Sequence, residues 1–299
     1  MARYSVATVA DGEGTTTALV VEGRIHPLPG RPSMRDLLVS WEASVERFER
    51  HLAAGDLEPT GNGDHPRLLP PIPNPPNLYM AGANYADHAR EMRKLAPDAP
   101  VPRSAVGPFM FLKPTSTLIG HRDEVRIAPG CERVDWEVEL AVVIGRRADS
   151  VPADQALGYV AGYTVANDVS VRDRFVREDA AEPAMKFDWL MQKGWATSCP
   201  LGPGLVPAAE LPDAQDKAMR LTVNGQVEQE SRTSQMIFSI AEQIAFVSAI
   251  VPLVPGDVIC TGTCAGVGAG KGRFLAPGDV MVAEIEGVGL LENPVVSGV

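Results

Sequence analysis

The sequence is poor in cysteine and has no long hydrophobic run. Four cysteines among 299 residues are too few and too scattered for a disulfide framework, so we expect free, mostly buried thiols. The longest apolar run, residues 244–254, is about half the length of a transmembrane helix. The N-terminus also lacks the pattern of a signal peptide. These absences favour a cytoplasmic protein that does not enter a membrane.

Positive charge is also scarce, because 27 basic residues face 38 acidic ones and the net charge is −11. A protein of this charge has no general attraction for nucleic acid or for an anionic membrane surface, so neither is an expected partner. An anionic small molecule stays compatible with this charge, because a bound divalent cation can reverse the local field.

The chain predicts two domains. Residues 1–70 indicate a small α+β domain, with two short β-prone stretches and one helix over residues 33–54. Six prolines between residues 66 and 76 form a stiff, extended boundary. Residues 71–299 then contain many short strands and few helices, without regular alternation of the two. This pattern favours an α+β fold with a mainly β core over a doubly wound parallel sheet.

The elements expected in the larger domain can be given by range. Strands are predicted over residues 77–81, 136–144, 156–167, 220–223, 258–260 and 280–285. Helices are predicted over residues 85–95 and 236–249. A glycine-rich stretch, residues 266–272, resembles a phosphate-binding loop but has Ala265 and Gly272 where that motif needs glycine and a hydroxyl residue. We therefore expect only a tight turn there.

Two glutamates mark the strand over residues 136–144. Alternation places Glu137 and Glu139 on one face, roughly 6.6 Å apart. The other face carries only apolar side chains: Trp136, Val138, Leu140 and Val142. At an effective dielectric of about 20, the two charges repel by roughly 2.5 kcal/mol. A solvated strand face would tolerate this pair, whereas a buried strand would require a shared proton or a cation.

A third carboxylate, Asp168, ends the next apolar strand. Three carboxylates with coordination positions left open suit Mg²⁺ or Mn²⁺, and they do not suit a closed zinc site. Glu137, Glu139 and Asp168 are therefore candidate metal ligands.

His88 and Glu91 lie three residues apart on a predicted helix that Asn84 could cap. A carboxylate beside an imidazole fixes its tautomer and produces a general base for water. The alternative is an ordinary surface pair. Three basic residues complete the set: Lys113 lies in a hydrophobic run, Arg172 is four residues after Asp168, and Lys193 precedes a Gly-Trp pair. A lysine among apolar neighbours is either paired or functional.

Together these segments resemble the fumarylacetoacetate hydrolase family over residues 77–296, as a longer bacterial-type member with a small N-terminal domain. The matching stretches are residues 82–88 with Glu91, 111–114, 135–140, 162–173, 199–203, 223–225 and 255–263. The resemblance implies a mixed β-roll or β-sandwich core and a homodimer. It also implies that Mg²⁺ or Mn²⁺, or Ca²⁺ in crystals, is held by the three carboxylates.

The resemblance assigns further roles. It implies that His88 and Glu91 activate water from a mobile lid helix, and that Lys193 stabilises developing negative charge. It implies a set of substrate-binding residues: Tyr85, Lys113, Arg172 and Thr263. Phe175 and Cys264 replace a glutamine and a proline that are common in the family, and residues 174–191 form a longer segment than in compact members. These departures lie where substrate selectivity is set.

The function predicted from the sequence is metal-dependent hydrolysis of a carbon–carbon bond in a small 1,3-diketo or acylpyruvate-type acid through an enolate. Two other activities use the same constellation: decarboxylation of oxaloacetate-like acids, and isomerisation or tautomerisation of 2-hydroxy-diene-dioates. A binding protein without catalysis is a third hypothesis, which the intact catalytic positions disfavour.

Overall fold

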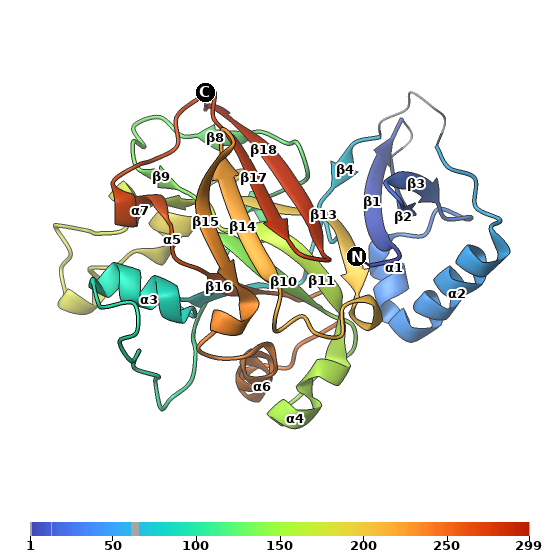
Figure 1. The fold of residues 1–299 in the computed structure, drawn as a ribbon, viewed down its shortest axis with the longest axis horizontal. Helices are drawn as coiled ribbons and strands as arrows, with labels where there is room; N and C mark the ends of the chain where they lie inside the picture. The colour runs from blue at the N-terminus through green and yellow to red at the C-terminus, as the bar shows by residue number, and fades with distance from the viewer. Residues whose placement is uncertain (1, 13, 61–65, 299) are drawn as a thin grey trace.

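The computed structural model of the protein describes residues 2–12, 14–60 and 66–298. These residues form packed β-sheets with helices around them (Figure 1). Within these ranges, no helix is long and apolar enough to span a bilayer. All four cysteines are free and buried, as expected. The predicted α+β class with a mainly β core is confirmed.

The largest sheet of the described chain has 11 strands and mixes antiparallel with parallel pairs. Along the sheet, its main path runs β3 (Arg24–Pro27), β2 (Gly14–Val21), β1 (Ser5–Asp11), β13 (Cys199–Pro207), β11 (Val160–Asn167), β10 (Val138–Ile144), β16 (Val258–Thr263), β5 (Leu78–Gly82) and β6 (Phe109–Leu112). Two short strands branch from it: β4 (Leu68–Leu69) and β7 (Leu118–Ile119).

A second sheet packs on the first. It consists of β15 (Gln226–Arg232), β14 (Ala218–Val223), β17 (Val280–Ile285), β18 (Gly289–Ser297) and β8 (Val125–Ile127). A small ribbon pairs β9 (Val134–Asp135) with β12 (Ser170–Val171). Because β9 ends just before β10, and β12 follows β11 closely, this ribbon lies beside the ends of the two central strands.

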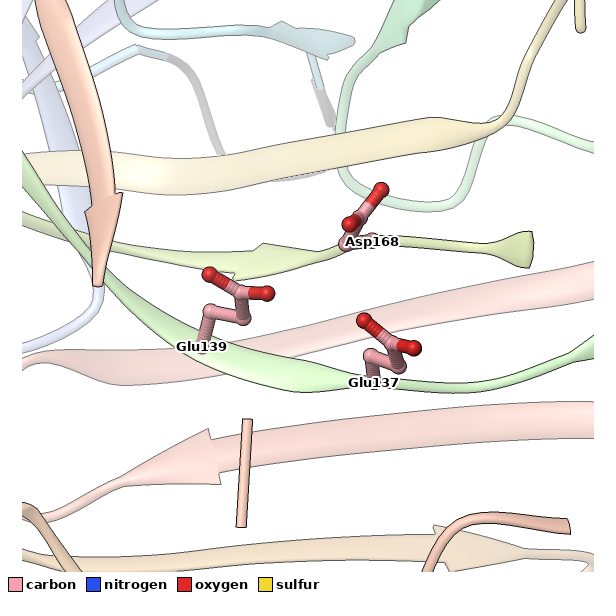
Figure 2. Close-up of side chains that lie close together, drawn as sticks. All are labelled: Glu137, Glu139 and Asp168. Carbon is pink, nitrogen blue, oxygen red and sulfur yellow. The ribbon is translucent and has the colours of Figure 1, made fainter. Parts of the chain in front are cut away.

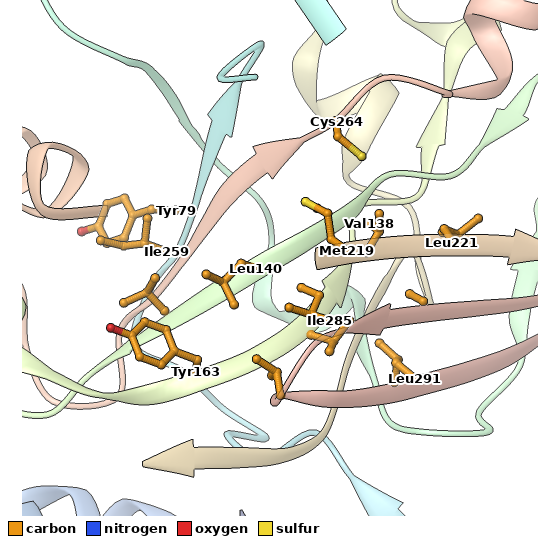
Figure 3. Close-up of a cluster of buried hydrophobic side chains, with 14 of the residues drawn as sticks. Tyr79, Val138, Leu140, Tyr163, Met219, Leu221, Ile259, Cys264, Ile285 and Leu291 are labelled. Carbon is orange, nitrogen blue, oxygen red and sulfur yellow. The ribbon is translucent and has the colours of Figure 1, made fainter. Parts of the chain in front are cut away.

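The core between the sheets follows the alternation that the sequence predicts for β10. Trp136, Val138, Leu140 and Val142 join one buried cluster, together with side chains of β14, β17 and β18. Figure 3 shows part of this cluster, with Val138 and Leu140 of β10 labelled. Ala141 and Val143 belong to a second cluster on the other face, with residues of the N-terminal segment. All residues of β10 are buried, so both faces of the strand lie in the protein interior, where an uncompensated charge such as that of Glu139 is costly.

The helices differ from the sequence prediction in their bounds. They are α1 (Met34–Val39), α2 (Trp41–Ala54), α3 (Ala86–Arg93), α4 (Ala153–Ala156), α5 (Trp189–Lys193), α6 (Ile240–Ile250) and α7 (Gly268–Lys271). Short 3₁₀ turns occupy residues 115–117, 157–159, 172–174, 183–185, 208–210 and 233–235. Helix α6 starts later than predicted because Ser239 and Glu242 form a capping box there.

The single helix predicted over residues 33–54 is wrong, since Ser40 leaves the helical conformation and separates α1 from α2. The break lets the Trp41 indole N–H donate to the Ala161 carbonyl in β11 at 2.9 Å. Strand β1 also pairs with β13 at Val6 and Leu205. The N-terminal segment thus shares its core with the large sheet, and the domain boundary between residues 70 and 71 stays a prediction.

Candidate metal centre and active site

The three candidate ligands meet at one end of the central strands. Glu137 precedes β10, Glu139 lies within it, and Asp168 follows β11. Because β10 and β11 pair antiparallel with Val138 opposite Asn167, the strands bring these side chains together. One oxygen of each carboxylate lies within 4.8 Å of the others, and all three residues are buried. Figure 2 shows the carboxylates turned toward one another, so the alternative of a solvated strand face is wrong.

Basic side chains compensate two of these carboxylates. Lys193 Nζ lies 2.8 Å from Glu137 Oε2 and 2.6 Å from Asp168 Oδ2. Lys113 Nζ lies 2.7 Å from Asp168 Oδ1. Arg172 Nη2 lies 2.5 Å from Glu137 Oε1. Glu137 and Asp168 therefore each have two cationic partners.

Glu139 is different. Its Oε2 accepts a hydrogen bond from the Gly262 N–H at 2.7 Å, but none of the ion pairs between described residues includes this carboxylate. Burial raises the pKa of Glu139 well above its usual value, and the charges of Asp168 and Glu137 raise it further. Burial also opposes the charge of Glu137, yet Lys193 and Arg172 hold its pKa at about 2.

This donor set fits a hard divalent cation. Three buried carboxylates supply the oxygen ligands that Mg²⁺ and Mn²⁺ prefer, and the coordination positions that they do not fill would be available to water or substrate. Glu139 provides the physical reason to expect a cation here. Its negative charge is buried and repelled by Asp168 and Glu137, and a bound cation would offset that cost. Glu137, Glu139 and Asp168 would hold the ion.

Metal affinity should therefore depend on pH. Below this raised pKa the metal-free protein carries a proton on Glu139, which metal binding must displace. Affinity for Mg²⁺ is expected to rise as pH increases through this raised pKa and to level off above it. Titration calorimetry in two buffers of different ionisation enthalpy should detect the released proton. Proton-independent binding from acidic to neutral pH would contradict the assigned role of Glu139.

The histidine–glutamate pair lies on α3, where His88 is nearly buried and Glu91 half-buried. His88 Nδ1 is 3.6 Å from Glu91 Oε2, a long contact of the kind that often tightens when a substrate binds. The Gly266 N–H donates to both oxygens of Glu91 at 3.0 Å. Although burial disfavours its charge, the nearby His88 imidazole and the hydrogen bonds from the Gly266 N–H lower the pKa of Glu91 and keep it ionised.

The helix start was predicted incorrectly. Tyr85, not Asn84, is the N-cap residue, and its side chain makes no capping hydrogen bond. Asn84 is buried and its amide instead donates to the Phe238 and Thr261 carbonyls at 3.0 and 2.8 Å. Asn84 thus fixes the start of α3 to the end of β16 rather than capping it.

The predicted substrate-binding residues occupy varied surroundings. Tyr85 is fully buried in the main core, and Lys113 is buried against Asp168. Thr263 is buried at the end of β16, and its hydroxyl donates to the Val138 carbonyl at 2.8 Å. Arg172 bridges Glu137 and Asp135 from a 3₁₀ turn. Their contact with a substrate stays a prediction.

Two positioning residues escaped the sequence analysis. Gln229 is fully buried; its Oε1 accepts from the Val138 N–H and its Nε2 donates to the Thr263 hydroxyl, both at 2.9 Å. It therefore clamps the ligand-bearing strand to β16. Asp135 accepts from Arg172 Nε at 2.8 Å. The sequence could have indicated a role for Asp135, because it lies two residues before Glu137 in an acidic motif. No sequence pattern indicated a role for Gln229.

Residues 174–191 attach to the edge strand beside the site. Phe175 stacks on Phe187 at 5.0 Å and meets Trp189 edge-on at the same separation. The Trp189 ring lies 4.8 Å from Phe111, whose own ring is 5.8 Å from Lys193 Nζ. The residue that replaces the family's common glutamine thus contributes to an aromatic wall near the carboxylates.

Comparisons with known proteins show the family of the chain. The family model described as fumarylacetoacetate hydrolase C-terminal matches residues 77–296. A human mitochondrial oxaloacetate tautomerase is 40% identical over 266 residues, which cover 88% of this chain and 80% of that protein.

Two solved structures share the whole fold. A 5-carboxymethyl-2-hydroxymuconate delta-isomerase from Mycobacterium smegmatis is 32% identical, with a TM-score of 0.74 and 99% of each chain covered. A maleylpyruvate hydrolase from Sphingobium sp. SYK-6 is 28% identical, with a TM-score of 0.78, and covers 98% of this chain and 100% of its own. The chain belongs to the fumarylacetoacetate hydrolase family, as the sequence motifs indicated.

Proposed function

We propose that this protein is a divalent-metal-dependent enzyme that interconverts tautomers or isomers of a small 2-oxo dicarboxylic acid. The observation that carries the proposal is the buried cluster of Glu137, Glu139 and Asp168, in which Glu139 has no cationic partner among the described residues. When bound there, a divalent cation would act as a Lewis acid that polarises the carbonyl oxygen of a 2-oxo acid.

The chain's own residues would bind the substrate and move its proton. His88 turns Nδ1 toward Glu91, which leaves Nε2 free to take a proton from the carbon beside a carbonyl group. Glu91 orients the imidazole and balances its positive charge after the transfer. Lys193 stays protonated, because Asp168 and Glu137 outweigh the effect of burial and raise its pKa. Its ammonium group would stabilise negative charge that develops on oxygen.

The degree of sequence identity to the relatives favours tautomerisation or isomerisation over the hydrolysis that was predicted from the sequence alone. The tautomerase is 40% identical and the isomerase 32%, against 28% for the hydrolase. Hydrolysis of a carbon–carbon bond is the second candidate, because the same His88–Glu91 pair could deprotonate water. The homodimer and the cytoplasmic location inferred earlier stay predictions.

A substrate panel separates these activities. The protein with Mg²⁺ is incubated with oxaloacetate, a 2-hydroxy-diene-dioate and an acylpyruvate, and enol absorbance, carbon dioxide and cleavage products are followed. We expect metal-dependent enol–keto exchange without carbon dioxide release, and its loss on chelation. Faster acylpyruvate cleavage with incorporation of labelled water would instead identify the hydrolase, and carbon dioxide release would identify a decarboxylase.

A further inference from the structure

The glycine-rich stretch over residues 266–272, here called the glycine loop, encloses the carboxylate of Glu91. The Gly266 N–H donates to both Glu91 oxygens at 3.0 Å. A methyl group built on Gly270 would lie only 2.9 Å from Glu91 Cδ and from Oε1. The loop thus both holds this carboxylate by hydrogen bonding and leaves no space for any side chain beside it.

The same loop reaches the carboxylate cluster on its other side. The Gly268 and Ala269 N–H groups donate to Asp135 at 2.6 and 3.0 Å. Asp135 in turn accepts from Arg172 Nε at 2.8 Å, and Arg172 Nη2 lies 2.5 Å from Glu137. A continuous chain of hydrogen bonds therefore links the glycine loop to a candidate metal ligand.

The loop is itself fixed to the β core. The Gly266 carbonyl accepts from the Trp136 indole N–H at 3.1 Å. Lys271 Nζ donates to the backbone and side-chain oxygens of Glu228 at 2.7 and 2.8 Å. One anchor, Trp136, precedes β10 and the other, Glu228, lies in β15, so hydrogen bonds hold the loop to both sheets. Helix α3, by contrast, has only eight residues and depends on such contacts for its order.

We propose that the glycine loop is a positioning element for the proton-transfer pair. It fixes Glu91, and through Glu91 the His88 imidazole, at a set place relative to Glu137 and its neighbours. The expected effect of the loop on catalysis rests on the proposed function, whereas its effect on the order of α3 is independent of that function. A phosphate-binding role is unnecessary, because the loop's N–H groups already donate to carboxylates of the chain.

The variant Gly270→Ala tests this proposal. Gly270 does not have a positive φ angle, so its backbone accepts alanine, and the new methyl group can be relieved by displacing the end of the flexible Glu91 side chain. We expect kcat to fall about 10- to 100-fold, as for a catalytic group displaced by about 1 Å, with KM and Mg²⁺ affinity unchanged. In the metal-free protein, amide hydrogen exchange over residues 86–93 should become faster.

A double-mutant cycle with Glu91→Ala gives the decisive readout. If the loop acts through Glu91, adding Gly270→Ala to that variant should change neither kcat nor the exchange of α3 any further. Additive effects, or wild-type exchange in Gly270→Ala, would overturn the proposal. Gly12→Ala is the control, because a methyl group there meets nothing within 4 Å. Absence of turnover with every 2-oxo acid would refute the proposed function, and hydrogen exchange alone would then decide the role of the loop.

Discussion

Replacing Glu139 with alanine is expected to abolish divalent metal binding and to reduce kcat by about 1000-fold. Glu137 and Asp168 would remain, but each is already engaged by two basic side chains. Glu139 is the candidate ligand whose carboxylate has no ion-pair partner within the described chain. Loss of Lewis-acid assistance costs several kcal/mol of transition-state stabilisation, at about 1.4 kcal/mol for each tenfold in rate. Calorimetric titration with Mg²⁺ and steady-state kinetics measure the two effects.

The isosteric variant Glu139→Gln separates metal loss from misfolding. Its amide oxygen can still accept from the Gly262 N–H, while the repelled charge is gone. A carboxyl whose pKa is raised by folding favours the native state fully only below its unfolded pKa, and this stability is lost as pH rises through the folded pKa. The metal-free variant should therefore unfold at the same or a higher temperature than wild type at neutral pH. A retained increase in Tm on adding Mg²⁺ would refute the ligand assignment.

The strand that carries the ligands could be predicted because its signal is local. Alternation in β10 follows from backbone geometry alone, and it correctly separated Glu137 and Glu139 from Trp136, Val138 and Leu140. The apolar neighbours also indicated that the strand is buried. Two like charges on a buried strand need a shared proton or a cation, so the pair pointed to a metal site. Asp168 was found for the same reason, since it ends the apolar strand that pairs with β10.

Contacts between distant segments could not be predicted in this way. Lys193 and Lys113 are 25 and 55 residues away from Asp168 in the sequence, yet both contact it. The residues that flank each lysine could indicate only that it is paired or functional. The break at Ser40 accompanies the hydrogen bond from Trp41 to β11, and Asn84 bonds to β16 instead of capping α3. In each case a tertiary hydrogen bond outweighs a local preference.

The second large effect is expected at the His88–Glu91 pair on α3. Replacing His88 with alanine should lower kcat by about 100-fold or more and leave the Mg²⁺ affinity unchanged. This loss is the usual contribution of a general base. The affinity should persist because all three carboxylates and their basic partners are retained. His88 Nδ1 is buried and has no hydrogen-bond partner within 3.5 Å among the described residues, so Glu91 at 3.6 Å is the group that orients it. Enol–keto exchange rates and calorimetry provide the two measurements.

Two further variants give this experiment its controls. Glu91→Gln keeps the size of the side chain but removes its charge, so it should reduce kcat less than His88→Ala does. His26→Ala removes a histidine from β3, where its Nδ1 contacts the Leu57 carbonyl at 2.9 Å, and should leave kcat unchanged. If His88→Ala retained wild-type rates with metal bound, the proton acceptor would have to lie elsewhere. The buried Lys193 could not replace it, because its raised pKa keeps it protonated and unable to accept a proton.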